Sequence, residues 1–156
     1  MALINKIKIK TKLTLQANDV WKLLQNFSIP HKYIPFLHNT IILGEPYSGL
    51  GSTRRVFTNY NYMDETVIKW EEGSGFTVKL HRNKQAPLPF TSATFTYQIR
   101  STDKNYCELI GIFNYELLFG TIGKFLNQLF LRILIRFNIR RVIIGMKEYL
   151  NQNIIT

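Results

Sequence analysis

The chain has 156 residues, of which 46% are hydrophobic and 13% aromatic, so it has the length of one domain and the composition of a folded protein. We therefore expect a single domain over residues 1–156. A lone cysteine, Cys107, excludes an internal disulfide framework and a cysteine-rich zinc site. The formal net charge of +10 favours acidic partners, but it does not choose among nucleic acid, an anionic membrane surface and an anionic ligand.

A first strand is predicted over residues 4–15, where basic and apolar side chains alternate at the period of a half-buried strand. The basic residues are Lys6, Lys8, Lys10 and Lys12. These lysines form either a patch for phospholipid headgroups or ribosomal RNA, or a solvated strand face that discourages edge aggregation. The alternation lacks the apolar block of a signal peptide, and no apolar run is long enough to span a membrane, so we expect a cytoplasmic protein.

Two short helices and a series of strands are predicted next. Asn18 or Asp19 can cap a helix that continues to Leu24, and Pro30 suits the first turn of a second helix that Pro35 closes. Six further strands are predicted at 39–46, 52–60, 63–72, 75–82, 92–101 and 106–118. The short turns between them favour antiparallel pairing.

The last predicted element is one long helix over about residues 121–152, rich in Leu, Ile and Phe. A helix that is apolar around most of its circumference must be covered by protein or ligand. An antiparallel sheet also has an apolar face that needs a cover. The sequence therefore predicts an α+β fold in which a curved sheet grips this helix, with a ligand cavity between them.

Several short segments, taken in their order and spacing, match a known pattern. They are Asn18–Leu24, Tyr33–Phe36, Gly49–Ser52 with Arg54-Arg55, Glu65–Trp70, Gly120–Lys124 and Gly145–Leu150. In these segments the chain resembles the START-like (SRPBCC, helix-grip) superfamily, closest to its polyketide cyclase/dehydrase and lipid-transport branch. The resemblance implies a curved seven-stranded antiparallel sheet around the C-terminal helix, with two short helices after the first strand.

The resemblance does not imply one reaction. Members of the superfamily include lipid and sterol carriers, aromatase/cyclases, plant allergens that hold hydrophobic ligands, and co-chaperones. Pro35-Phe36-Leu37 is also similar to a motif of the coenzyme-Q-binding and ribosome-associated branch. A module that docks on a ribosome or a protein is therefore a further alternative.

Groups for acid-base or metal chemistry are few. The three histidines, His31, His38 and His81, do not have a metal-ligand spacing, and the chain has no nucleophile elbow, P-loop or dinucleotide fingerprint. We expect no metal, no cofactor and no catalytic residue. His81 keeps a place in the enzyme alternative, where it or a cavity tyrosine or arginine would polarise a carbonyl group.

Two carboxylates, Glu65 and Glu116, lie in strands that could aim them inward. On the 63–72 strand, Thr66, Ile68 and Trp70 look like the inward set, which would place Glu65 outside. Glu116 is expected on the outer face of its strand for the same reason. Both carboxylates are therefore expected to be solvated.

Aromatic residues are the main candidates for contact with a ligand. Alternation along the strands selects Trp70, Phe76, Phe95, Tyr97, Phe113 and Tyr115. Tyr33 and Phe36 are expected at a cavity mouth that they form with the 83–91 loop, which Pro87 and Pro89 stiffen.

Arg132 and Arg136 share a stripe of the long helix with Ile139, Ile143 and Met146. If that stripe faces the sheet, each arginine needs a partner, and one of them would anchor the acidic group of an otherwise apolar ligand. Alternatively, the helix is tilted and both arginines extend to the rim with their charges in water.

The function predicted from the sequence is binding, and possible transport, of a hydrophobic small molecule or lipid in the cavity. A polyketide cyclase/dehydratase-like enzyme on the same fold is the first alternative. An anionic membrane surface is a further partner to consider, and no nucleic-acid-binding motif accompanies the basic residues.

Overall fold

The computed structural model describes residues 4–118 and 120–154. Its elements follow in the order β1 (Asn5–Leu13), α1 (Ala17–Leu24), α2 (Pro30–Tyr33), β2 (Asn39–Ile42), β3 (Thr53–Phe57), β4 (Tyr62–Glu71), β5 (Gly75–His81), β6 (Phe90–Asp103), β7 (Tyr106–Leu117), α3 (Gly120–Leu126), the π-helical turn η1 (Asn127–Leu131) and α4 (Arg132–Ile154). The last three form one continuous helical stretch. The predicted order of strand, two short helices, six strands and long helix is confirmed.

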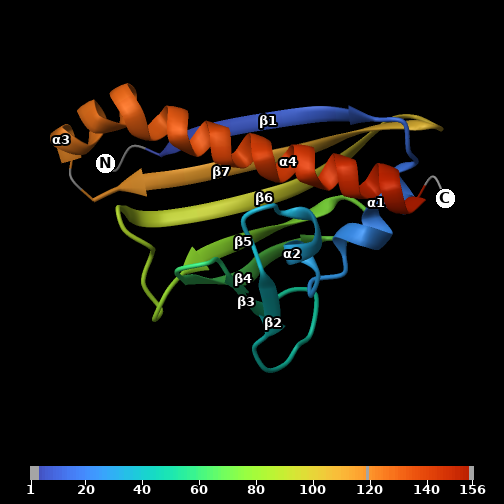
Figure 1. Ribbon diagram of the computed structural model, residues 1–156, viewed down its shortest axis with the longest axis horizontal. Coiled ribbons are helices and arrows are strands. Elements are labelled where there is room, and N and C mark those ends of the chain that lie inside the picture. Colours follow the sequence, from blue (N-terminus) through green and yellow to red (C-terminus); the bar gives the residue numbers. More distant parts are fainter. Residues whose placement is uncertain (1–3, 119, 155–156) are drawn as a thin grey trace.

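The strands form one antiparallel sheet in the order β1-β7-β6-β5-β4-β3-β2. The first strand in the chain pairs with the last, so the sheet joins the two ends of the sequence. α4 lies over the β1–β7 side of this curved sheet, and α1 and α2 lie near the C-terminal end of α4 (Figure 1). The architecture is the α+β arrangement expected from the sequence.

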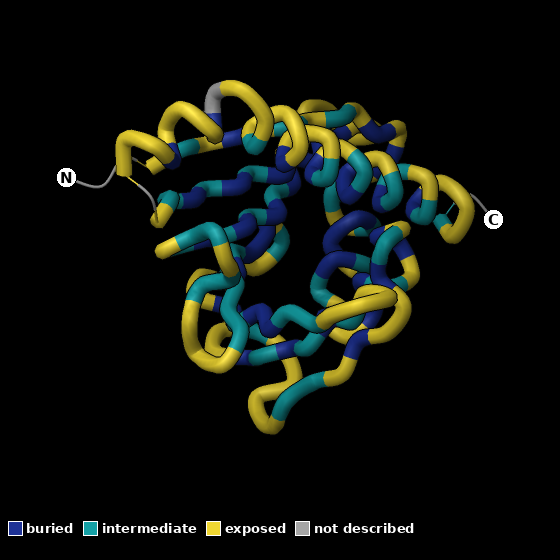
Figure 2. The backbone as a smooth tube through the Cα atoms, turned by 60° about the vertical axis from the view of Figure 1, so that its left-hand side comes forward, coloured by how far each residue is buried: buried dark blue, intermediate teal, exposed yellow. Residues whose placement is uncertain are grey.

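The core lies between the sheet and the C-terminal half of α4, as the dark-blue segments in Figure 2 show. Ile139, Ile143 and Met146 on α4 are buried there, whereas Arg132 and Arg136 of the same predicted stripe are exposed. On β1, Ile7 and Leu13 point into the core while the alternating lysines are exposed. Removing this apolar surface from water is the main force that holds the helix on the sheet.

Gly145 allows α2 to approach α4 closely. A Cβ atom at this position would lie 2.1 Å from the backbone oxygen of Tyr33, well inside van der Waals contact. A glycine inside a helix lowers its intrinsic stability. Here the missing side chain makes room for the backbone at the end of α2.

Two tryptophans attach α1 to the far part of the sheet. Trp21 on α1 and Trp70 on β4 meet edge to face, with ring centroids 5.1 Å apart. The indole N–H groups of both rings donate hydrogen bonds to the carboxylate of Glu72, at 2.8 Å and 2.9 Å. These hydrogen bonds lower the pKa of Glu72. Trp70 is thus part of the support for α1.

Two smaller features complete the fold. α1 begins after Gln16, so Asn18 and Asp19 lie in its first turn and do not cap it as expected. Within residues 4–118 and 120–154, no helix is long and apolar enough to cross a membrane.

Candidate ligand cavity and its polar end

A cavity of about 410 Å³ lies between the inner face of the sheet and α4. The strands, the β3–β4 turn and the β5–β6 loop contribute Val56, Thr58, Met63, Glu65, Leu80, Pro89, Phe90, Phe95, Tyr97 and Phe113. The helices and the segment after α2 contribute Ile34, Phe36, Leu37, Leu131, Leu134, Ile135, Asn138, Ile139 and Val142. Most of these side chains are apolar. Glu65 is the one ionisable carboxylate among them.

Glu65 forms an ion pair with a fully buried arginine behind the cavity wall. Arg54 Nε donates a hydrogen bond of 2.6 Å to Glu65 Oε2, and Arg54 Nη1 donates one of 3.1 Å to the backbone oxygen of Phe27. The Arg54 guanidinium also lies 4.3 Å above the centre of the Phe27 ring. Burial lowers the pKa of Arg54, but the charge of Glu65, the hydrogen bond to it and the nearby Tyr97 and Tyr33 together outweigh this effect, and the net pKa is raised. The guanidinium therefore stays charged.

The charges of this ion pair shift the pKa values of two nearby tyrosines. Burial raises the pKa of the Tyr97 hydroxyl well above its ordinary value, and Glu65 adds to the rise. Burial also raises the pKa of Tyr33, while the positive charge of Arg54 partly offsets it. In the part of the chain that the structure describes, the Tyr33 hydroxyl and Arg54 Nη2 are buried without a hydrogen-bond partner. Unpaired buried donors of this kind are rare and costly.

The polar cluster of Arg54, Glu65, Tyr33 and Tyr97 gives the cavity a hydrogen-bonding inner end. A ligand hydroxyl or carbonyl group at this end would meet the phenol of Tyr97 and the carboxylate of Glu65, which both line the cavity. The rest of the wall can contact a hydrocarbon skeleton. Such a site is suited to a mostly apolar molecule that carries a polar group at one end.

The predicted aromatic site residues fall into three groups. Phe36, Phe95, Tyr97 and Phe113 line the cavity. Trp70 and Phe76 stack on each other with centroids 5.4 Å apart and do not line it. Tyr115 is also outside the lining, and its hydroxyl donates a hydrogen bond of 2.5 Å to Asn127 Oδ1.

Two expectations about the mouth of the cavity are tested by this geometry. Phe36 and Pro89 both line the cavity, which agrees with a wall formed by the segment after α2 and the β5–β6 loop. Tyr33 does not line it. Its buried hydroxyl belongs to the polar cluster, so the expectation that Tyr33 lies at the mouth is wrong.

The expected outward orientation of Glu65 is also wrong, and a β-bulge explains why. The register between β4 and β5 shifts between Val67 and Lys69, which inserts one extra residue at Ile68. Strict alternation counted back from Trp70 along β4 therefore assigns Glu65 to the wrong face of the strand. Ile68 is 48% exposed, while Glu65 is 8% exposed and faces the cavity.

Arg132 and Arg136 do not face the cavity. Both are exposed and lie on the side of α4 next to β1. Arg132 Nη2 reaches the backbone oxygen of Lys6 at 3.4 Å, and Arg136 lines a surface groove with Lys8 and Lys10. The anchor hypothesis thus loses its geometric basis, and the tilted-helix alternative describes both arginines. Water solvates their charges at lower cost than a buried position without a partner.

The remaining titratable candidates lie outside the cavity. His31 Nδ1 is 2.9 Å from Thr40 Oγ1, His81 Nε2 is 2.8 Å from Thr66 Oγ1, and His38 is exposed. Glu116 is partly exposed. Among residues 4–118 and 120–154, no group of three or more His, Cys, Asp or Glu side chains is placed to hold a metal ion.

Solved structures of the same architecture are numerous. The Zhui aromatase/cyclase from Streptomyces sp. R1128 superposes with a TM-score of 0.77 at 12% identity, over 97% of this chain and 96% of that one. Norcoclaurine synthase from Thalictrum flavum, in complex with dopamine and hydroxybenzaldehyde, gives 0.71 at 13% identity over 97% and 89%. A START superfamily protein from Mycobacterium smegmatis gives 0.69 at 13% over 94% and 97%.

This chain has the START-like helix-grip fold. No protein-family model and no curated protein matches it by sequence. The structural similarity confirms the seven-stranded curved sheet and the long C-terminal helix that the resemblance implied. At 12–13% identity it concerns the fold and does not transfer a ligand or a reaction.

Proposed function

We propose that the protein binds a hydrophobic small molecule or lipid in the cavity between the sheet and α4, and that it carries this molecule. The observation that supports the proposal is a largely apolar cavity of about 410 Å³ with hydrogen-bonding groups at its inner end. One protein of this fold, norcoclaurine synthase, was solved with dopamine and hydroxybenzaldehyde. A cytoplasmic location remains a prediction from the sequence.

The polar cluster narrows the chemical class of the ligand. Arg54 is already paired with Glu65, so the inner end presents no uncompensated positive charge among the described residues. A carboxylate placed there would meet the negative Glu65 and would lose its hydration. A neutral hydroxyl or carbonyl group can bond to Tyr97 or Glu65 without that cost. We therefore favour a neutral polar group over the acidic head group expected from Arg132 and Arg136.

A matched pair of ligands tests both parts of this proposal. Oleyl alcohol and oleic acid share one hydrocarbon chain and differ in the head group, so calorimetric titration compares the head groups directly. The proposal expects saturable binding of the alcohol and weaker binding of the acid at neutral pH. Native mass spectrometry of the purified protein would identify any bound molecule. Tighter binding of the acid would contradict the neutral-ligand proposal, and no binding of either would count against a long-chain ligand.

A cyclase- or dehydratase-type enzyme is the second candidate, because Tyr97 and Glu65 bring a phenol and a carboxylate into the same apolar cavity. His81 does not line the cavity and its Nε2 lies 2.8 Å from Thr66 Oγ1, so this candidate is supported by Tyr97 and Glu65 and not by His81. Incubation with a polyketone-like substrate would reveal any turnover. The enzyme proposal requires that Tyr97→Phe reduces this turnover while binding of oleyl alcohol persists.

A further inference from the structure

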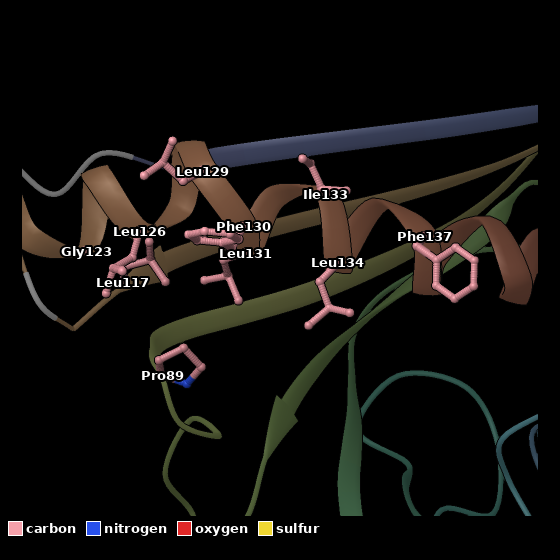
Figure 3. Close-up of a pocket in the computed structure, with 10 residues that line it drawn as sticks. All are labelled: Pro89, Leu117, Gly123, Leu126, Leu129, Phe130, Leu131, Ile133, Leu134 and Phe137. Carbon is pink, nitrogen blue, oxygen red and sulfur yellow. The ribbon is translucent and has the colours of Figure 1, made fainter.

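The outward face of the long helix is apolar along its first half. Phe130, Ile133 and Phe137 are 70%, 68% and 59% exposed, and Leu126, Leu129 and Leu134 are each about half exposed. These six residues are here called the apolar face. They line a surface groove of about 630 Å³ that Pro89 and Leu117 close on the sheet side (Figure 3). Contiguous exposed apolar surface of this kind marks an interaction site in soluble proteins.

The helical period explains how this face arises. At about 100° per residue, Phe130, Ile133 and Phe137 point away from Ile135 and Ile139, which are buried against the sheet. The helix is therefore apolar on both sides. The core covers one side, and nothing in the described chain covers the other.

Positive charge flanks the apolar face. Arg132, Arg136 and Arg140 are exposed on the side of α4 next to β1. Arg136 and Arg140 line a groove of about 720 Å³ together with Lys8 and Lys10 of β1. Glu148 lines the same groove and Lys10 pairs with Glu108, but Lys8, Arg136, Arg140 and Lys147 leave this part of the surface with an excess of positive charge.

These observations favour one occupant. We propose that the apolar face docks on a lipid bilayer that contains anionic phospholipids. Apolar side chains would enter the boundary between headgroups and acyl chains, and the arginines beside them would contact phosphate groups. A second copy of this chain fits less well, because a symmetric contact would bring two surfaces with the same excess of positive charge together.

The apolar face is continuous with the ligand cavity, so docking on a bilayer would also place the cavity next to the lipids. Pro89, Leu131 and Leu134 line both the surface groove and the cavity. A bilayer on this face would therefore lie at the entrance that these residues share. If the protein binds a hydrophobic ligand as proposed above, that ligand passes between membrane and cavity with little exposure to water.

Sedimentation with vesicles tests the proposal without reference to any cavity ligand. The full chain is mixed with vesicles of phosphatidylcholine alone or of phosphatidylcholine with phosphatidylserine. Binding is expected with the second and much weaker with the first. Ile133→Gln/Phe137→Gln should reduce the affinity for the mixed vesicles by about tenfold or more, because two exposed apolar side chains can no longer enter the bilayer. Tyr60→Gln, at a 95% exposed position outside the apolar face, is the matched control and should bind as the parent does.

A second pair of variants tests the charges. Arg136→Gln/Arg140→Gln should weaken binding to the mixed vesicles more than Lys79→Gln/Lys104→Gln, which removes the same charge from exposed positions elsewhere. Equal binding by Ile133→Gln/Phe137→Gln and the parent chain would overturn the proposal. So would failure of the parent chain to bind mixed vesicles, whether or not it self-associates or binds another protein through the same face.

Discussion

Arg54 and Glu65 are direct partners across the β3–β4 hairpin, joined by a hydrogen bond of 2.6 Å between Arg54 Nε and Glu65 Oε2. The arginine side chain is completely buried, and the carboxylate forms part of the cavity wall. One ion pair thus links the stability of the sheet to the polarity of the candidate site.

Replacing Glu65 with leucine should destabilise the protein strongly, because Arg54 would keep a buried charge without a partner. The expected loss in the free energy of unfolding is about 3–5 kcal/mol, measured by urea denaturation. The double variant Arg54→Met/Glu65→Leu should recover much of this loss. Glu71→Leu on the same strand breaks an exposed pair with Lys69 and should cost less than about 1 kcal/mol. Equal losses for Glu65→Leu and Glu71→Leu would contradict the assignment of Arg54 as buried.

The buried tyrosines should make the protein sensitive to alkaline pH. The pKa values of Tyr33 and Tyr97 are raised above their ordinary value of 10.0 in the folded state, mainly by burial. The folded chain therefore holds protons that the unfolded chain releases above this pH. The free energy of unfolding should fall as the pH rises through and beyond 10.0, which denaturation at a series of pH values can measure.

Tyr33→Phe should make this alkaline loss less steep, because it removes one of the buried tyrosines whose pKa is raised. It should also preserve or raise the stability at neutral pH, since the Tyr33 hydroxyl is buried and unpaired. Tyr60→Phe, at the 95% exposed position, is the control and should leave the slope unchanged. A slope that Tyr33→Phe does not alter would argue against the burial of this hydroxyl.

Gly145→Ala should destabilise the protein, although alanine normally stabilises a helix relative to glycine. The new methyl group would lie 2.1 Å from the Tyr33 backbone oxygen and would push α2 away from α4. We expect a loss of about 1–3 kcal/mol in thermal or urea unfolding. Asn151→Ala, at an exposed position of α4, is the control and should be neutral or stabilising. A stabilising effect of Gly145→Ala would show that α2 does not approach the helix so closely.

Much of the fold could be predicted from the sequence because its elements have clear periods and turns. The alternation in β1 and the inward residues of β6 follow from local patterns alone. Phe95, Tyr97 and Phe113 were assigned to the cavity by the same reasoning, and the structure places all three there.

The polar end of the cavity was missed because it depends on register. Alternation in β3 requires Arg54 and Arg55 to face opposite sides, but the pattern does not say which one is inside. Which arginine faces the cavity is set by the register of the β3–β4 hairpin, in which Phe57 pairs with Tyr62. Which residues of β4 face the cavity depends also on the bulge at Ile68. A shift of one residue reverses every face of a strand. The apolar face of the long helix could not be predicted either, because the helix is apolar on both sides and its sequence does not say which side the sheet leaves exposed.

Filling the cavity distinguishes a ligand held between the sheet and α4 from one bound elsewhere on the surface. Met63 lines the cavity on β4, and Ile68 lies on the outer side of the same strand. Met63→Trp and Ile68→Trp therefore add the same indole to the two faces, and binding of oleyl alcohol to each can be measured by calorimetry beside its melting temperature. We expect both variants to stay folded and binding to be lost in Met63→Trp alone. Undiminished binding by folded Met63→Trp would contradict the placement of the ligand between the sheet and α4.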